Sequence, residues 1–189
     1  MNHSAENHIF TIECKDIILR EYLVDDVEAL CALTRQPEIK EFLPDWDVPL
    51  AQRVEWITHY ETVDNQRFLQ AAAKDGKVGG IPLRLGIILK ESGEFIGWCN
   101  TLMKEEMPKP NREIMYAISN QHTKKGYTTQ AVQSLAKYLF SHTDVMMLNA
   151  IALTHNIASN KVIRKSGFEY VDLIEIEGKT YNHYKLYKA

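Results

Sequence analysis

Two polar segments in the second half of the chain have residue types and spacings that could carry chemistry, and the first is suited to binding an anion. The first covers residues 123 to 129, T-K-K-G-Y-T-T, and comes directly before a stretch with helical periodicity. A helix N-terminus presents unpaired backbone N–H groups at the positive end of the helix dipole. Lys124 and Lys125 add positive charge, and Gly126 lets the backbone approach a ligand closely. The segment predicts a phosphate-binding turn, although a solvated turn that caps a helix would look similar.

The second segment covers residues 156 to 168, N-I-A-S-N-K-V-I-R-K-S-G-F. Asn156 stands where a helix N-cap is expected, and Gly167 stands where a left-handed C-cap is expected. The stretch from Val145 to Leu153 precedes it and is nearly all apolar, as in a strand covered on both faces. The pattern predicts a strand followed by a short capped helix.

Together the two segments resemble the signature segments of the GNAT acyl-CoA N-acyltransferases. In particular they resemble the branch of the RimJ/RimL-type ribosomal-protein N-terminal acetyltransferases. The resemblance runs from about Ile17 to Tyr187. It implies an α+β, mixed α/β, single-domain GNAT fold, whose mostly antiparallel sheet is splayed to admit acyl-CoA and is flanked by helices. It also implies direct transfer of an acetyl group from acetyl-CoA to a primary amine in a ternary complex.

The resemblance assigns cofactor contacts to three places. The phosphate turn of the family reads Q/R-x-x-G-x-G/A, and here Thr123 and Thr128 replace the expected Gln or Arg and Gly or Ala. The strand Glu113 to Ser119 would offer a freed backbone N–H to the acyl carbonyl. Lys161 and Arg164 would reach the adenosine end, or lie on a solvated helix face. The implied cofactor-binding residues are Ala117, Ile118, Thr123, Lys124, Lys125, Gly126, Tyr127, Thr128, Thr129, Asn156, Ser159 and Asn160.

The implied catalytic residues are Ser159, Glu175 and Glu113. Many members of the family carry a tyrosine where this chain has Ile163, and that phenol protonates the leaving thiolate. Since Ile163 has no proton to give, Ser159 is the nearby hydroxyl left for this role. Glu175 and Glu113 are candidate bases for the incoming amine, directly or through water, and each could equally be an ordinary strand-surface carboxylate.

The implied substrate-binding residues are Phe42, Asp45, Trp46, Asp47 and His183. The segment from Phe42 to Asp47 mixes aromatic and acidic side chains, which would favour a cationic amine in an apolar cleft. The alternatives are that Asp47 caps a helix beside a core Trp46 and that His183 is structural. The acceptor stays open among a protein N-terminus, an antibiotic amine, a polyamine and an amino acid.

Composition bounds the remaining possibilities. The chain has 189 residues with 45% hydrophobic residues, which suits one domain over residues 1–189. A net charge of −3 argues against a nucleic-acid partner. Three widely spaced cysteines and seven scattered histidines predict neither a disulfide framework nor a metal site. The first eight residues lack the apolar run of a secretory signal, so we expect a cytoplasmic protein without membrane contact.

Periodicity predicts the order β-α-α-β-β-β-α-β-α-β-β. A second helix beginning near Pro49 would bury Leu50, Val54, Ile57 and Tyr60, and residues 73 to 82 would form a loop. The predicted strands cover residues 16–21, 84–90, 94–103, 113–119, 145–153, 170–176 and 180–187.

Two other functions remain as alternatives. The departures at Thr123, Thr128 and Ile163 would fit a catalytically silent acyl-CoA sensor, or an interaction module that has lost its cofactor. The sequence also leaves open whether the protein forms a homodimer.

Overall fold

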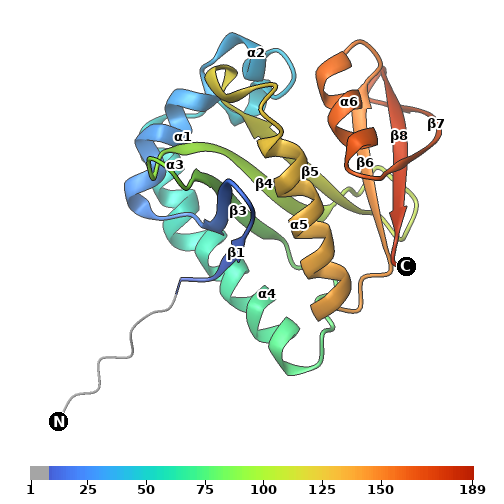
Figure 1. Cartoon of the computed structure of the whole chain (residues 1–189), viewed down its shortest axis with the longest axis horizontal. Coiled ribbons are helices and arrows are strands. Elements are labelled where there is room, and N and C mark those ends of the chain that lie inside the picture. The colour runs from blue at the N-terminus through green and yellow to red at the C-terminus, as the bar shows by residue number, and fades with distance from the viewer. Residues whose placement is uncertain (1–8) are drawn as a thin grey trace.

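The computed structural model describes residues 9–189. The first eight residues, which lack the apolar run of a secretory signal, lie outside it. The described chain forms an eight-stranded sheet with helices packed against it, in the strand order β1-β2-β3-β4-β5-β6-β8-β7 (Figure 1). All neighbouring strands are antiparallel except the parallel pair β5 and β6. The strands are β1 (Thr11–Glu13), β2 (Ile17–Glu21), β3 (Leu83–Leu89), β4 (Phe95–Met103), β5 (Arg112–Ile118), β6 (Met147–Leu153), β7 (Glu169–Ile176) and β8 (Lys179–Tyr187).

The helices follow the predicted order, with additions that the sequence pattern does not reveal. These additions are the short strand β1, the short helix α2 and a π-helical turn, η3, inside the second long helix. The helices are α1 (Val27–Thr34), α2 (Pro37–Lys40), α3 (Leu50–Trp56), η3 (Ile57–Glu61), α4 (Thr62–Lys74), α5 (Tyr127–His142) and α6 (Ile157–Lys165). The 3-10 turns are η1 (Val24–Asp26), η2 (Pro44–Trp46) and η4 (Asn120–His122). Among the described residues, no helix combines the length and the apolar character needed to cross a membrane.

The sheet opens between its two parallel strands. Strand β5 pairs with β4 along its whole length, but its register with β6 holds only at Glu113 and Asn149. In Figure 1, strands β6 to β8 with α6 stand apart from strands β3 to β5. From Glu113 toward its C-terminal end, β5 therefore has an edge that β6 does not cover, as the predicted splayed sheet requires.

Two hydrophobic clusters fix the helices to the sheet. One joins the strands to α5, where the predicted stripe of Ala131, Val132 and Leu135 is buried. The other joins Val27 and Leu30 of α1 to Trp98 of β4. Because side chains alternate along a strand, odd and even positions of β5 face these two different environments.

The predicted burial of the second helix is wrong. Leu50, Val54 and Tyr60 are 45%, 36% and 57% exposed, and of the four predicted positions only Ile57 is buried. The buried positions are instead Arg53, Ile57, Glu61, Asn65 and Phe68. The π turn adds a residue to one turn, which shifts the inward-facing positions away from the expected 3.6-residue period. Polar side chains tolerate this burial where they find partners, and Asn65 exchanges two 2.8 Å hydrogen bonds with the Arg84 backbone.

Residues 75–82 form the predicted loop after α4, which extends to Lys74. The loop is anchored rather than free. Val78 is buried, and the guanidinium of Arg112 on β5 donates to the carbonyl groups of Gly79 and Ile81.

Candidate active site

The turn before α5 has the geometry of an anion site. Gly126 is the N-cap of α5 and has a φ of 83°, a left-handed conformation that favours glycine. Residues 123–126 are exposed, and no side chain of the described residues caps this helix end. A Cβ added at Gly126 would meet no atom within 4 Å, so the space in front of the turn is open. The side chain of Thr128 is buried, away from this space.

The uncovered edge of β5 leads directly into this turn. The Ser119 N–H donates to Ile96 of β4 over 2.8 Å. Because hydrogen-bonding directions alternate along a strand, the N–H of Ala117 also points toward β4, whereas those of Tyr116 and Ile118 point toward β6. Of the two predicted donors to an acyl carbonyl, Ile118 is therefore the one whose N–H faces the opening.

The N-terminus of α6 forms the opposite side of the opening. The Asn156 side chain accepts a hydrogen bond from the Ser159 N–H at 3.1 Å, as expected of an N-cap. The Tyr116 hydroxyl lies 3.0 Å from Ser159 Oγ and donates to the Ser159 carbonyl at 3.1 Å. Burial raises the pKa of the Tyr116 phenol, so it stays protonated at neutral pH. The sequence gives no signal for a role of Tyr116 beyond strand alternation, which places it on one face with Ile114 and Ile118.

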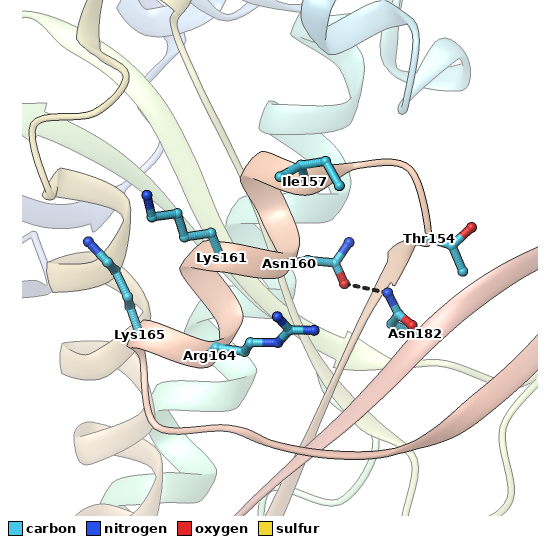
Figure 2. A pocket seen from close by; sticks show the side chains of 7 residues that line it. All are labelled: Thr154, Ile157, Asn160, Lys161, Arg164, Lys165 and Asn182. Atoms are coloured by element: carbon cyan, nitrogen blue, oxygen red, sulfur yellow. Dashed lines mark hydrogen bonds between the residues drawn. The ribbon is translucent and has the colours of Figure 1, made fainter.

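Asn160 does not have the predicted role, because its side chain is buried and fully used inside the protein. Its Nδ2 donates to the carbonyl groups of Leu153 and Asn156, and its Oδ1 accepts from Asn182 and Tyr184. This amide cannot also bind a cofactor without breaking these bonds. Figure 2 shows the bond between Asn160 and Asn182 beneath the exposed face of α6.

A shallow cavity of about 330 Å³ lies along α6 beside these amides. Its lining includes three cationic side chains, Lys161, Arg164 and Lys165, which form no ion pair with any acidic group in residues 9–189. Arg164 extends toward Asn160 and Asn182, whereas both lysines extend away from them (Figure 2). The positive charges of Lys161 and Lys165 therefore stay available to a phosphate at the adenosine end of an acyl-CoA.

The two candidate bases lie in different environments. Glu113 on β5 is 7% exposed, and burial raises the pKa of its carboxyl from 4.5 to about 7, with Lys104 opposing the shift. It faces the same side of the strand as Met115. Glu175 is exposed on β7, the strand at the far edge of the sheet. A general base works best when its pKa lies near the working pH. The raised pKa therefore favours Glu113 over Glu175.

The predicted acceptor loop contributes a wall to a second cavity. The Trp46 ring stacks on that of Trp98 at 4.8 Å between centroids and 5° between planes. Asp45 and Trp46 line this cavity of about 430 Å³, which we call the tryptophan pocket. It lies on the α1–α3 side of the sheet, and its other lining residues are Arg53, Trp56, Tyr60, Glu61, Arg84, Asn100, Leu102 and Met115.

Three predicted acceptor residues lie elsewhere. Asp47 is paired with Lys40 at 2.7 Å and Arg35 at 3.7 Å, and this hydrogen bond from Lys40 lowers the pKa of its carboxyl. Its charge is thus neutralised locally. The Phe42 ring packs against His155, just before α6, with 5.8 Å between centroids.

His183, the third of these residues, lies inside the fold and is not part of the lining of the tryptophan pocket. It is buried on β8, and its ring nitrogens bond Asp172 and Asn149, each at 2.9 Å. These partners hold it near the register point of β5 and β6. It therefore supports the base of the splay.

A protein-family model described as "Acetyltransferase (GNAT) domain" matches residues 16–169. The chain therefore belongs to the GNAT acetyltransferase family. It is 26% identical over 164 residues to the uncharacterized N-acetyltransferase p20 of Bacillus licheniformis, covering 87% of this chain and 85% of that protein. It is also 26% identical over 160 residues to the uncharacterized N-acetyltransferase YoaA of Bacillus subtilis, covering 84% and 82%.

Solved structures show the same fold at low identity. An acetyltransferase of the GNAT family from Bacillus anthracis superposes with a TM-score of 0.74 and 15% identity over 95% of this chain and 99% of that one. AAC(6')-Ib, solved with paromomycin and acetyl-CoA, superposes with a TM-score of 0.69 and 17% identity, over 92% of this chain and 94% of that one. A proposed ribosomal-protein-serine acetyltransferase from Vibrio cholerae superposes with a TM-score of 0.68 and 16% identity, over 94% of this chain and 97% of that one.

Proposed function

We propose that this protein transfers the acetyl group of acetyl-CoA directly to a primary amine. The observation that carries the proposal is the open N-terminus of α5, which continues from the uncovered edge of β5. An anion at this helix end and an extended chain along the strand edge match the pyrophosphate and pantetheine of acetyl-CoA. Lys124 and Lys125 supply positive charge at the turn, and Lys161 and Lys165 supply it along α6.

The proposed reaction forms a C–N bond to the acetyl carbon and breaks its C–S bond. The Ile118 N–H would donate to the carbonyl oxygen as negative charge develops on it. The thiolate would take a proton from the Ser159 hydroxyl, behind which the Tyr116 phenol holds a second proton. The amine would lose its proton to Glu113 through ordered water, because Glu113 lies five residues from Ile118 along β5, too far for a direct transfer. The products are the acetylated amine and coenzyme A with a free thiol.

Two measurements test this function. Calorimetry should show saturable binding of coenzyme A to the purified chain, and acetyl-CoA should release free thiol when a suitable amine is added. Absence of coenzyme A binding would contradict the proposal. Binding without thiol release over a broad amine panel would instead support the acyl-CoA sensor.

We also propose that the chain belongs to the RimJ/RimL-like branch. Support comes from the serine at position 159, which lies next to the opening. The features that suggest this branch lie near the departing thiolate and say nothing about the acceptor. The acceptor side is built from residues that the signature segments do not include.

A further inference from the structure

The tryptophan pocket contains buried polar atoms whose hydrogen-bonding capacity is unused. Within residues 9–189, Arg53 Nε, Asn100 Nδ2 and Glu61 Oε2 have no hydrogen-bond partner. The three residues are 1%, 1% and 7% exposed, and all of them line the pocket. Leaving such groups unpaired costs about 1–3 kcal/mol each, so they indicate a ligand or ordered water at this place.

The pocket is positioned to serve the reaction. Its floor is a row of residues in register across three strands, Arg84 on β3, Asn100 on β4 and Met115 on β5. Ala117, two residues beyond Met115, lies about 7 Å further along β5 at the end that leads into the phosphate turn. Leu102, another lining residue, is in register with Glu113. The floor thus lies between the candidate base and the proposed acetyl position.

The charges of the pocket suit a ligand that carries both signs. Arg53 is held between Trp46 and Trp56, with its guanidinium carbon 5.6 Å and 5.0 Å from the ring centroids. Its carboxylate partner Glu61 is 3.8 Å away, and burial raises the pKa of that carboxyl. Arg84 adds a second cation, partly balanced by Asp64 at 3.0 Å. Two carboxylates, Asp45 and Glu61, line the same pocket, so the lining offers partners to a ligand that has both a negative and a positive group.

The unused donors and the aromatic walls point to the rest of the ligand. Arg53 Nε and Asn100 Nδ2 are both donors, so they call for an acceptor such as a carboxylate. Trp46, Trp56 and Tyr60 offer apolar surface for a side chain. A volume of about 430 Å³ is within the range of small-molecule sites.

We propose that the tryptophan pocket is the acceptor site and that it takes a free α-amino acid with an apolar or aromatic side chain. The carboxylate would bind the donors of Arg53 and Asn100, and the α-amine would point toward β5 and the acetyl group. This inference rests on the proposed function, because only an acetyltransferase would use the amine. It narrows the four acceptor classes left open by the sequence to one.

The test compares acceptors that differ in a single group. Thiol release from acetyl-CoA is measured with L-phenylalanine, L-tryptophan, their C-terminal amides, phenethylamine, spermidine and kanamycin. We expect kcat/KM for the free amino acids to exceed that for the amides and phenethylamine at least about tenfold, since the analogues leave buried donors unpaired. The two polycations have no carboxylate for these donors, so their kcat/KM should also fall below that of the free amino acids.

A variant then locates the carboxylate. Asn100→Asp keeps the oxygen that accepts from Tyr22 and the Leu85 N–H, each at 3.0 Å, and replaces only the unpaired donor. It should raise KM for L-phenylalanine at least about tenfold, because the ligand carboxylate loses its amide donor and meets a second carboxyl, and it should raise KM for phenethylamine much less. An equal loss for both acceptors would contradict the assignment. If this variant does not fold, the wild-type acceptor series decides by itself.

The outcomes separate the two proposals. Equal or better transfer to amides, which would indicate a peptide N-terminus, or to a polycation would overturn the amino-acid acceptor and leave the acetyltransferase standing. Coenzyme A binding without transfer to any acceptor would overturn both.

Discussion

Helix α5 and the continuous α3–η3–α4 helix differ in the character of their buried faces. The buried face of α5 is mainly apolar, with Ala131, Val132 and Leu135 in the core. The other helix turns Arg53, Glu61 and Asn65 inward and leaves Val54 and Tyr60 exposed. The first arrangement stabilises a fixed frame for a cofactor. The second places charge and hydrogen-bonding groups where a variable substrate can be recognised, at a cost in stability.

If this comparison is right, substitutions on the cofactor side and on the acceptor side should change different constants. Among these substitutions, replacement of the proposed base Glu113 should have the largest effect.

Glu113→Gln should lower kcat/KM about 100-fold, a typical contribution of general base catalysis. Wild-type kcat/KM should rise with pH and level off above about 7, because Glu113 must be ionised to accept a proton. The variant should lose this rise. The pH dependence of kcat/KM, measured for both proteins, checks this. An unchanged profile in the variant would assign the base to another group.

The same substitution should raise stability at high pH. A carboxyl whose pKa is raised on folding contributes stability that is lost as pH rises from about 4.5 through about 7. Glutamine avoids this loss, so the variant should be more stable than wild type by up to about 3 kcal/mol at pH 8 and no more stable at pH 4. Urea unfolding at both pH values checks this. A lower stability at pH 8 would mean that the charged form is stabilised in the fold.

Gly126→Val should weaken coenzyme A binding at least about tenfold. A β-branched side chain is strained at a φ of 83° and would occupy the open space before the α5 amides. Gly178→Val is the matched control, since Gly178 has a φ of 73°, open space and a place in the β7–β8 turn. Calorimetry should show weaker binding only for the first variant. Similar affinities for both would place the phosphates away from this turn.

Ser159→Ala should lower kcat about tenfold with little change in the Kd of acetyl-CoA, because the hydroxyl acts on the departing sulfur. Tyr116→Phe should have a smaller effect, since it removes only the proton behind Ser159. Steady-state kinetics and calorimetry separate the two constants. A parallel loss in binding and rate would make Ser159 a cofactor contact alone. Restoring the family tyrosine at Ile163 is not a useful test, because Ile163 is buried in the core.

The sequence predicted the N-termini of α5 and α6 because the signals for these helix ends are local. Caps, glycines and apolar spacing at Asn156, Gly126 and along α5 depend on residues close in the chain, and the structure shows them in the predicted places. The acceptor side depends on contacts between distant segments. Neither the π turn nor the partner of Asp47 can be read from periodicity, and a rule that puts apolar residues inside cannot find a buried Arg53.

The smallest effects should come from the acidic pair of the predicted acceptor loop, and they should differ between its members. Asp45→Asn removes a charge at the pocket lining and should raise the acceptor KM a few-fold, through a screened interaction. Asp47→Asn should leave KM unchanged, because its charge is already paired with Lys40 and Arg35. It should instead lower stability slightly at neutral pH. The lowered pKa of Asp47 means that its contribution is present above its unfolded value and is lost as pH falls through the folded one, so the Asp47→Asn difference should vanish in acid. Acceptor kinetics and thermal unfolding at pH 7 and pH 3 check both members. Equal KM changes in the two variants would show that the loop acts through its total charge. Asp45 would then have no specific role in the tryptophan pocket.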